Sequence, residues 1–154
     1  MIKKIISGGQ TGVDRAALDI AIALNFPHSG WCPKGRKAED GLIPAKYQLQ
    51  ETPSPDYSER TAWNVRDSDG TLIICQNEIM GGTLLTMKVA QQLKKSYFIF
   101  DVAKRQDIKL IKHWLKENQI YLLNIAGPRE SQSYGIYQLA FKLLQNLLMS
   151  KESE

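Results

Sequence analysis

The sequence predicts an α/β fold, a three-layer sandwich in which helices cover both faces of a mainly parallel sheet. Short apolar runs alternate along the chain with longer stretches of helical periodicity. This alternation is typical of strand–helix–strand units, whose right-handed crossovers place helices on both sides of a parallel sheet. Glycine-rich turns stand between several strands and the helices that follow them. In parallel sheets, such turns lie at the edge where ligands bind.

The elements follow from the apolar pattern in chain order. The first strand is expected at residues 2–7, and the first helix at 14–25, where apolar residues recur at helical spacing. Later strands are expected at 26–31, 71–75, 97–101 and 120–126. Later helices are expected at 58–67, 81–95, 106–118 and 131–149. Ser58 is the expected N-cap of the second helix. The last helix is more broadly apolar than one packing face requires. We expect its additional apolar residues to be covered either by a second subunit or by the protein's own sheet.

Residues 32–57 interrupt the alternation. This stretch holds four of the six prolines and is too long for an ordinary connection. Its apolar and aromatic residues favour an ordered segment folded over the sheet edge or the site. The length of 154 residues corresponds to one domain. We therefore expect a single ligand-binding domain at 1–150 containing this excursion, followed by a polar tail at 151–154.

Composition limits the classes of partner. The net charge of +4 and the pI near 9.0 favour anionic small ligands. The basic residues are scattered, so we expect no nucleic acid partner. No apolar run approaches the roughly 20 residues of a membrane span, and no signal peptide is visible. We expect a cytoplasmic protein. Cys32 and Cys75 form no CxxC motif or His/Cys cluster, so no metal site is expected.

A glycine turn between the first strand and the first helix is the strongest motif. Gly8-Gly9-Gln10-Thr11-Gly12 lets the backbone approach a ligand, and the helix start offers unpaired N–H groups to phosphate. The Walker lysine is absent. Asp14 and Arg15 follow, and Asp14 would repel a phosphate placed directly on it or accept a heterocycle N–H. Gly9→Asp is expected to abolish binding and leave folding nearly intact.

Two further loops are predicted to meet this turn at the carboxyl edge of the sheet. Gly81-Gly82-Thr83 opens one helix, and Arg129 and Ser131 precede another. Arginine binds phosphate through two parallel hydrogen bonds. The alternative is that the glycines only punctuate turns.

Trp31, at the start of the excursion, could stack on a flat anionic ligand, and Lys34 and Arg36 could bind its charge. The alternative is a surface loop that is anchored by a buried Trp31. In the second helix, Arg60 and Asn64 share a face with Asp67 that either lines the crevice or is solvated. The candidate ligand-binding residues are Gly8, Gly9, Gln10, Thr11, Gly12, Asp14, Arg15, Trp31, Lys34, Arg36, Gly81, Gly82, Thr83, Arg129 and Ser131.

Several segments together resemble the molybdenum carrier family, which includes a molybdenum cofactor carrier protein. The segments are SGGQTGVDRAALDIA, GWCPKGRKAEDG, PAKYQLQET, YSERTAWNVRDSDGTLI and a GGT before a helix. That family belongs to the SLOG group of Rossmann-like proteins, related to the LOG hydrolases. The resemblance implies a Rossmann-like fold, a pterin-phosphate or nucleotide ligand, and a homo-oligomer, either a dimer or a tetramer.

One departure from the related LOG hydrolases bears on activity. Those enzymes carry a catalytic glutamate shortly after the Gly-Thr pair, whereas Leu84, Leu85, Thr86 and Met87 follow here. We therefore predict a binding or carrier protein for a phosphorylated heterocycle, with molybdenum cofactor or a nucleotide derivative as cargo, and assign no catalytic residue. Two alternatives stay open. One is a nucleotide glycosidic hydrolase that uses a carboxylate, and the other is a nucleotide-derivative sensor. The carboxylates available are Asp14, Glu39, Asp40 and Glu59.

Overall fold

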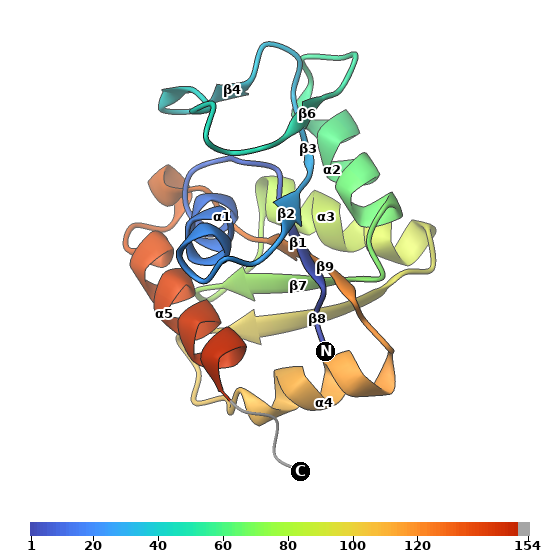
Figure 1. The fold of residues 1–154 in the computed structure, drawn as a ribbon, viewed down its shortest axis with the longest axis vertical. Coiled ribbons are helices and arrows are strands. Elements are labelled where there is room, and N and C mark those ends of the chain that lie inside the picture. The colour runs from blue at the N-terminus through green and yellow to red at the C-terminus, as the bar shows by residue number, and fades with distance from the viewer. Residues whose placement is uncertain (151–154) are drawn as a thin grey trace.

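A five-stranded sheet forms the centre of the protein in a computed structural model that describes residues 1–150 (Figure 1). The predicted polar tail at 151–154 lies outside the described residues. All neighbouring strands of this sheet pair in parallel, in the order β2-β1-β9-β7-β8. The strands are β1 (Lys4–Ile6), β2 (His28–Ser29), β7 (Gly70–Cys75), β8 (Ser96–Asp101) and β9 (Leu122–Ala126). The mainly parallel sheet predicted from the sequence is confirmed.

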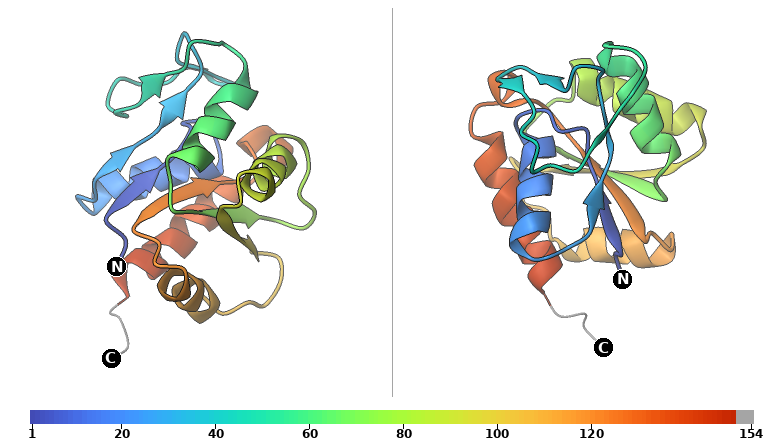
Figure 2. Two further views of the ribbon diagram at one scale, coloured as in Figure 1. Left: turned by 90° about the vertical axis from the view of Figure 1, so that its right-hand side faces the viewer. Right: turned by 45° about the horizontal axis from the view of Figure 1, so that its top comes forward.

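Helices pack on both faces of the sheet, which gives the predicted three layers (Figure 2). The helices are α1 (Val13–Ala23), α2 (Tyr57–Arg66), α3 (Gly81–Gln92), α4 (Lys109–Glu117) and α5 (Ile136–Met149). On one face, α1, α4 and α5 bury a large apolar cluster that includes Leu72 and Ile74 of β7. On the other face, Val65 of α2 packs with Val89 and Ala90 of α3. Because β7 is covered on both faces, all six of its residues are buried.

Four helix starts among the described residues differ from the prediction. Helix α1 begins one residue earlier, at Val13, and α4 begins three residues later than residue 106, at Lys109. The second helix begins at Tyr57 with Asp56 as N-cap, and the Asp56 carboxylate accepts a hydrogen bond from the Ser58 N–H at 3.1 Å, so the expected Ser58 cap is wrong. The last helix does not begin at Ser131, which lies in a separate 3-10 turn, η1 (Glu130–Gln132). That turn is capped by Ser133, and Gly135, in a left-handed conformation with φ 89°, is the N-cap of α5, which starts only at Ile136.

The chain between Trp31 and α2 forms a separate small layer above the sheet edge, which we call the loop segment (Figure 1). It contains two strand pairs: β3 (Trp31–Cys32) with β6 (Gln50–Glu51), and β4 (Lys37–Ala38) with β5 (Gly41–Leu42). Its side chains pack on Leu18 of α1, and Cys32 is fully buried in that cluster. The segment therefore sits beside the start of α1, over the sheet edge.

Among residues 1–150, no helix combines the length and apolar character that a membrane span requires.

Candidate functional site

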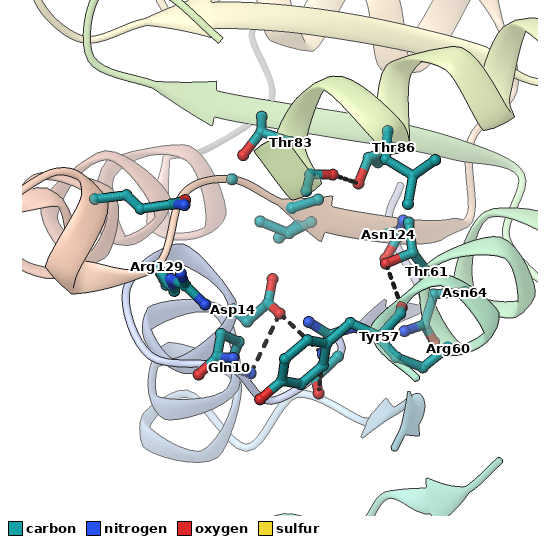
Figure 3. A pocket seen from close by; sticks show the side chains of 17 residues that line it. Gln10, Asp14, Tyr57, Arg60, Thr61, Asn64, Thr83, Thr86, Asn124 and Arg129 are labelled. Carbon is teal, nitrogen blue, oxygen red and sulfur yellow. Dashed lines mark hydrogen bonds and ion pairs between the residues drawn. The ribbon is translucent and has the colours of Figure 1, made fainter. Parts of the chain in front are cut away.

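A cavity of about 220 Å³ opens at the carboxyl ends of β1 and β9, beside the start of α3 (Figure 3). The loops after β1 and β9 and helices α2 and α3 form its walls. The three loops predicted to converge therefore do meet in one crevice. Its labelled polar side chains are Gln10, Asp14, Tyr57, Arg60, Thr61, Asn64, Thr83, Thr86, Asn124 and Arg129.

The first turn of α3 presents unpaired polar groups to this cavity. Gly81 and Gly82 occupy the first two helical positions, where helix geometry gives their N–H groups no partner. Of these two predicted residues, Gly82 lines the cavity and Gly81 does not. A Cβ on Gly82 would meet no atom within 4 Å, so the cavity is open at that point. Thr83 is only 4% exposed, yet its hydroxyl has no hydrogen-bond partner among the described residues. A buried hydroxyl without a partner is costly, and a ligand oxygen would satisfy it.

Asp14 places a buried carboxyl group on a different wall of the cavity. Its carboxylate accepts a hydrogen bond from the Gln10 N–H at 3.2 Å and lies 3.7 Å from the Arg60 guanidinium. Arg60 also donates to the Gly8 carbonyl oxygen at 2.7 Å. Burial raises the pKa of Asp14 to about 6, and Arg60, Gln10 and Arg15 oppose that rise. A phosphate beside Asp14 would therefore meet a negative charge at neutral pH.

Most of the glycine turn supports packing instead of lining the cavity. Gly8 and Gln10 line it. Gly9 has a φ of 81°, and a Cβ there would lie 2.7 Å from Cδ1 of Leu49 in the loop segment. A Cβ on Gly12 would lie 2.3 Å from the Pro128 carbonyl oxygen. The geometry argues against the expectation that Gly9→Asp leaves folding nearly intact, because the new residue would adopt an unfavourable φ and the Leu49 side chain would have to move.

A second anion site lies close by, and the chain's own Glu39 fills it. The Glu39 carboxylate accepts hydrogen bonds from the Thr11 hydroxyl and from the N–H and hydroxyl of Ser131. Arg129 Nε lies 3.4 Å from the same carboxylate without the alignment of a hydrogen bond. Burial alone would raise the pKa of Glu39, but the Ser131 and Thr11 hydrogen bonds and Arg129 outweigh it and lower the pKa. Thr11 and Ser131, predicted to hold a ligand, thus hold Glu39, whereas Arg129 also lines the cavity.

Three of the other predicted residues, Arg15, Trp31 and Arg36, anchor the loop segment. Arg15 donates to the Gly9 carbonyl oxygen and pairs with Asp40 at 3.0 Å. Trp31 donates its indole N–H to Asp67 at 2.8 Å.

Arg36 donates to four carbonyl oxygens of the loop segment, those of Ile43, Pro44, Tyr47 and Leu49. Lys34 is exposed. None of Arg15, Trp31, Lys34 and Arg36 lines the cavity. The predicted stacking and cationic contacts of Trp31, Lys34 and Arg36 are therefore not found at the cavity.

Several cavity residues are absent from the predicted set. Arg60 and Asn64 were weighed only as one helix face, and both line the cavity, whereas Asp67 on that face pairs with Arg66. Asn124 is buried within β9, where its amide donates to Thr71 at 3.2 Å. Nothing in the local sequence marks a polar residue inside a strand as part of a site. Tyr57, Thr61, Thr86 and Gln132 complete the missed polar lining.

Within residues 1–150, no three His, Cys, Asp or Glu side chains gather closely enough to hold a metal ion.

The parallel sheet, its two helical layers and the cavity at its carboxyl edge define a Rossmann-like α/β protein. The sequence matches the family model of the circularly permutated YpsA SLOG family (cpYpsA) over residues 5–148, and the chain belongs to that family. This confirms the resemblance to SLOG proteins.

A crystal structure from Syntrophus aciditrophicus SB, of a protein named "Putative molybdenum carrier protein", is closely similar. Its TM-score is 0.92 at 52% sequence identity, and the alignment covers 96% of this chain and 95% of that chain. No curated protein matches the sequence. The similarity confirms the Rossmann-like fold.

Proposed function

We propose that this protein binds and carries a phosphorylated heterocyclic small molecule in the cavity at the start of α3. The molybdenum cofactor, a pterin phosphate, is the first candidate cargo, and a nucleotide derivative is the second. The name of the Syntrophus protein supports the molybdenum carrier role. The single observation that carries the binding site is the buried Thr83 hydroxyl, which has no partner among the described residues.

The phosphate is assigned to the first turn of α3. Gly82 and Thr83 line the cavity at the positive end of the helix dipole, where the Gly82 N–H and the Thr83 hydroxyl would donate to the phosphate. The first turn of α3 contains no acidic residue that would repel an anion. Arg129 lines the same cavity and adds positive charge.

The heterocycle is assigned to the wall formed by Asp14, Asn64 and Asn124. Figure 3 shows Asp14 and Thr83 on different walls of the cavity, so a phosphate at Thr83 avoids the Asp14 charge. A carboxylate accepts hydrogen bonds from ring N–H groups, and the amides of Asn64 and Asn124 can donate or accept. Pterin and purine rings both present such N–H groups, so this wall suits either cargo.

Calorimetry on Thr83→Val tests the site, with Thr86→Val as the matched control. Thr86 lies one turn further along α3 and lines the same cavity, but its hydroxyl already donates to the Gly82 carbonyl oxygen at 2.9 Å. With AMP and a pterin phosphate as probes, we expect Thr83→Val to weaken binding about tenfold, by ~1.4 kcal/mol. Thr86→Val should bind like the wild type. Thr83→Val should not lower the melting temperature, because the hydroxyl it removes has no hydrogen-bond partner within residues 1–150.

Two results would contradict the proposal. Absence of heat from the wild type with every probe would reject binding in this cavity. Equal affinity of the wild type and Thr83→Val would remove the start of α3 from the phosphate site. Inorganic molybdate serves as the control for an anion without a heterocycle.

Nucleotide hydrolysis is the second candidate function, and Asp14 favours it. Of the four carboxylates weighed from the sequence, only Asp14 lines the cavity. Glu39 accepts from Ser131, Asp40 pairs with Arg15, and Glu59 accepts from the Ser54 N–H at 3.0 Å. A carboxyl with a pKa of about 6 suits general acid–base work. Release of free base from AMP by the wild type, lost in Asp14→Asn, would establish this activity.

We further propose that the protein acts in the cytoplasm as a homo-oligomer, as expected from the sequence.

A further inference from the structure

A second cavity of about 300 Å³ adjoins the first at the start of α3. The loop after β7, from Cys75 to Met80, forms one side of it, and Pro128 and Ser133 form the other. Thr83 and Gln132 line both cavities. The two spaces therefore meet where the unpartnered Thr83 hydroxyl is buried.

The size of the cavities bears on the ligand. Small-molecule sites in proteins usually measure about 300–1,000 Å³. The first cavity, at about 220 Å³, lies below that range, whereas a ligand that extends into both has adequate room. Because the proposed phosphate site lies at their junction, such a ligand has chemical groups on both sides of its phosphate.

The lining of the second cavity indicates which group it holds. It contains amide and hydroxyl side chains, including Gln76, Asn77 and Ser133, and one acid, Glu78, beside the apolar Cys75, Ile79, Met80 and Pro128. Among residues 1–150, no Lys, Arg or His lines it, unlike the first cavity, where Arg60 and Arg129 do. A free terminal phosphate would therefore meet no cation there. Amide and hydroxyl groups suit a neutral, hydroxyl-rich group such as a sugar.

We propose that the ligand is a two-part molecule joined through an internal phosphate or pyrophosphate that crosses the start of α3. The heterocycle occupies the first cavity, and a neutral hydroxylated group occupies the second. This inference rests on the proposed function, because it keeps the phosphate at Thr83. Of the two candidate cargoes it favours the nucleotide derivative, because a pterin phosphate ends in its phosphate and has no group for the second cavity.

Calorimetry with AMP, ADP and ADP-ribose tests the inference. The three probes share adenosine; ADP adds a terminal phosphate, and ADP-ribose adds a neutral sugar beyond it. We expect ADP-ribose to bind the wild type about tenfold more tightly than ADP, a gain of ~1.4 kcal/mol. Ser133→Tyr fills the second cavity and should remove that gain while leaving AMP binding unchanged. Thr61→Tyr fills the first cavity and should weaken all three probes.

A second variant that fills the cavity, Glu78→Trp, keeps the test valid if Ser133→Tyr does not fold. Ser133 is half-buried and its hydroxyl donates to Gln76, so Ser133→Tyr is checked by thermal melting. Glu78 is exposed in the same cavity, and Glu78→Trp fills it without disturbing a buried side chain. The same selective loss of the ADP-ribose gain is expected.

The outcomes separate the two proposals. Heat from AMP or the pterin phosphate, without tighter binding of ADP-ribose than of ADP, overturns this inference alone. An ADP-ribose gain that survives both filling variants also overturns it. No heat from any probe rejects the proposed function, and this inference with it.

Discussion

Asp14 is an acidic side chain held at 8% exposure beside the glycine turn, where burial opposes its charge. Its pKa of about 6 lies above the ordinary value of 3.8. A carboxyl whose pKa is raised by folding favours the folded state when it is protonated. That contribution is fully present below about pH 3.8 and is lost as the pH rises through about 6. Keeping Asp14 ionised at neutral pH therefore lowers the stability of the fold. It also leaves a carboxylate that can accept a hydrogen bond from a ligand N–H.

Asp14→Asn is predicted to remove this pH dependence. Relative to the variant, the wild type should lose on the order of 3 kcal/mol in free energy of unfolding between pH 4 and pH 7. Urea denaturation of both proteins across this range measures the difference. Other carboxyls, such as Glu39 and Asp40, are unchanged in the variant, so their contributions cancel. Parallel pH profiles of the two proteins would show that Asp14 titrates near its ordinary pKa.

The structure of the loop segment depends on one side chain, that of Arg36. Arg36 itself has a left-handed φ of 52°, and its guanidinium joins four carbonyl oxygens of residues 43–49. Glu39 and Asp40 then fasten the segment to Ser131 and to Arg15. These bonds connect the segment to η1 after β9 and to the first turns of α1.

Arg36→Lys is predicted to loosen the loop segment without unfolding the sheet. A lysine cannot reach four acceptors in one plane, and each lost bond is worth about 1 kcal/mol. Opening of the segment should become ~2 kcal/mol easier, so the amides of Ile43 and Tyr47 should exchange roughly thirtyfold faster. Hydrogen exchange resolved by residue measures this. Amides of β7 should be unchanged, and faster exchange there would instead indicate global destabilisation.

Arg66→Lys is the matched control for Arg36→Lys. Arg66 pairs with Asp67 at 2.8 Å on an exposed surface, with half of its side chain accessible. Surface ion pairs contribute little, about 0–1 kcal/mol. The control should leave exchange in the loop segment at the wild-type rate.

For the whole molecule, the exposed apolar residues on α1 and α5 bear on assembly. The two helices pack against each other, and Ile22 of α1 and Leu139 of α5 are each 40% exposed. The inner face of α5 is buried in the protein's own core, through Ile136, Leu144 and other residues. In the expected homo-oligomer, the outer face of α5 is therefore the part of the helix that can contact another subunit.

Leu139→Glu is predicted to shift a homo-oligomer to the monomer, because it places a charge on that outer face. Sedimentation velocity measures the change in mass. Leu110→Glu is the control: Leu110 is 48% exposed on α4, and the substitution should leave the assembly intact. A monomeric wild type, or equal effects of the two substitutions, would contradict the prediction.

The fold class and the place of the cavity could be predicted from the amino-acid sequence. Helical and strand periodicity depend on neighbouring residues, so the alternation of elements could be predicted from them. Strand order could not, because β1 pairs with β9 through contacts between residues more than a hundred positions apart. The convergence of the three loops followed from the parallel sheet, and Gln10, Thr83 and Arg129 do line one cavity.

Which polar groups remain available to a ligand depends on how distant segments of the chain pack together. Thr11 and Ser131 are suited to an anion, but Glu39 reaches them from a distant part of the chain. Arg36 meets carbonyl oxygens of its own segment, whereas Thr83 is buried without a partner. A residue type specifies which hydrogen bonds a side chain can make. Packing between distant segments decides which of them the protein itself uses, and so which are left for a ligand.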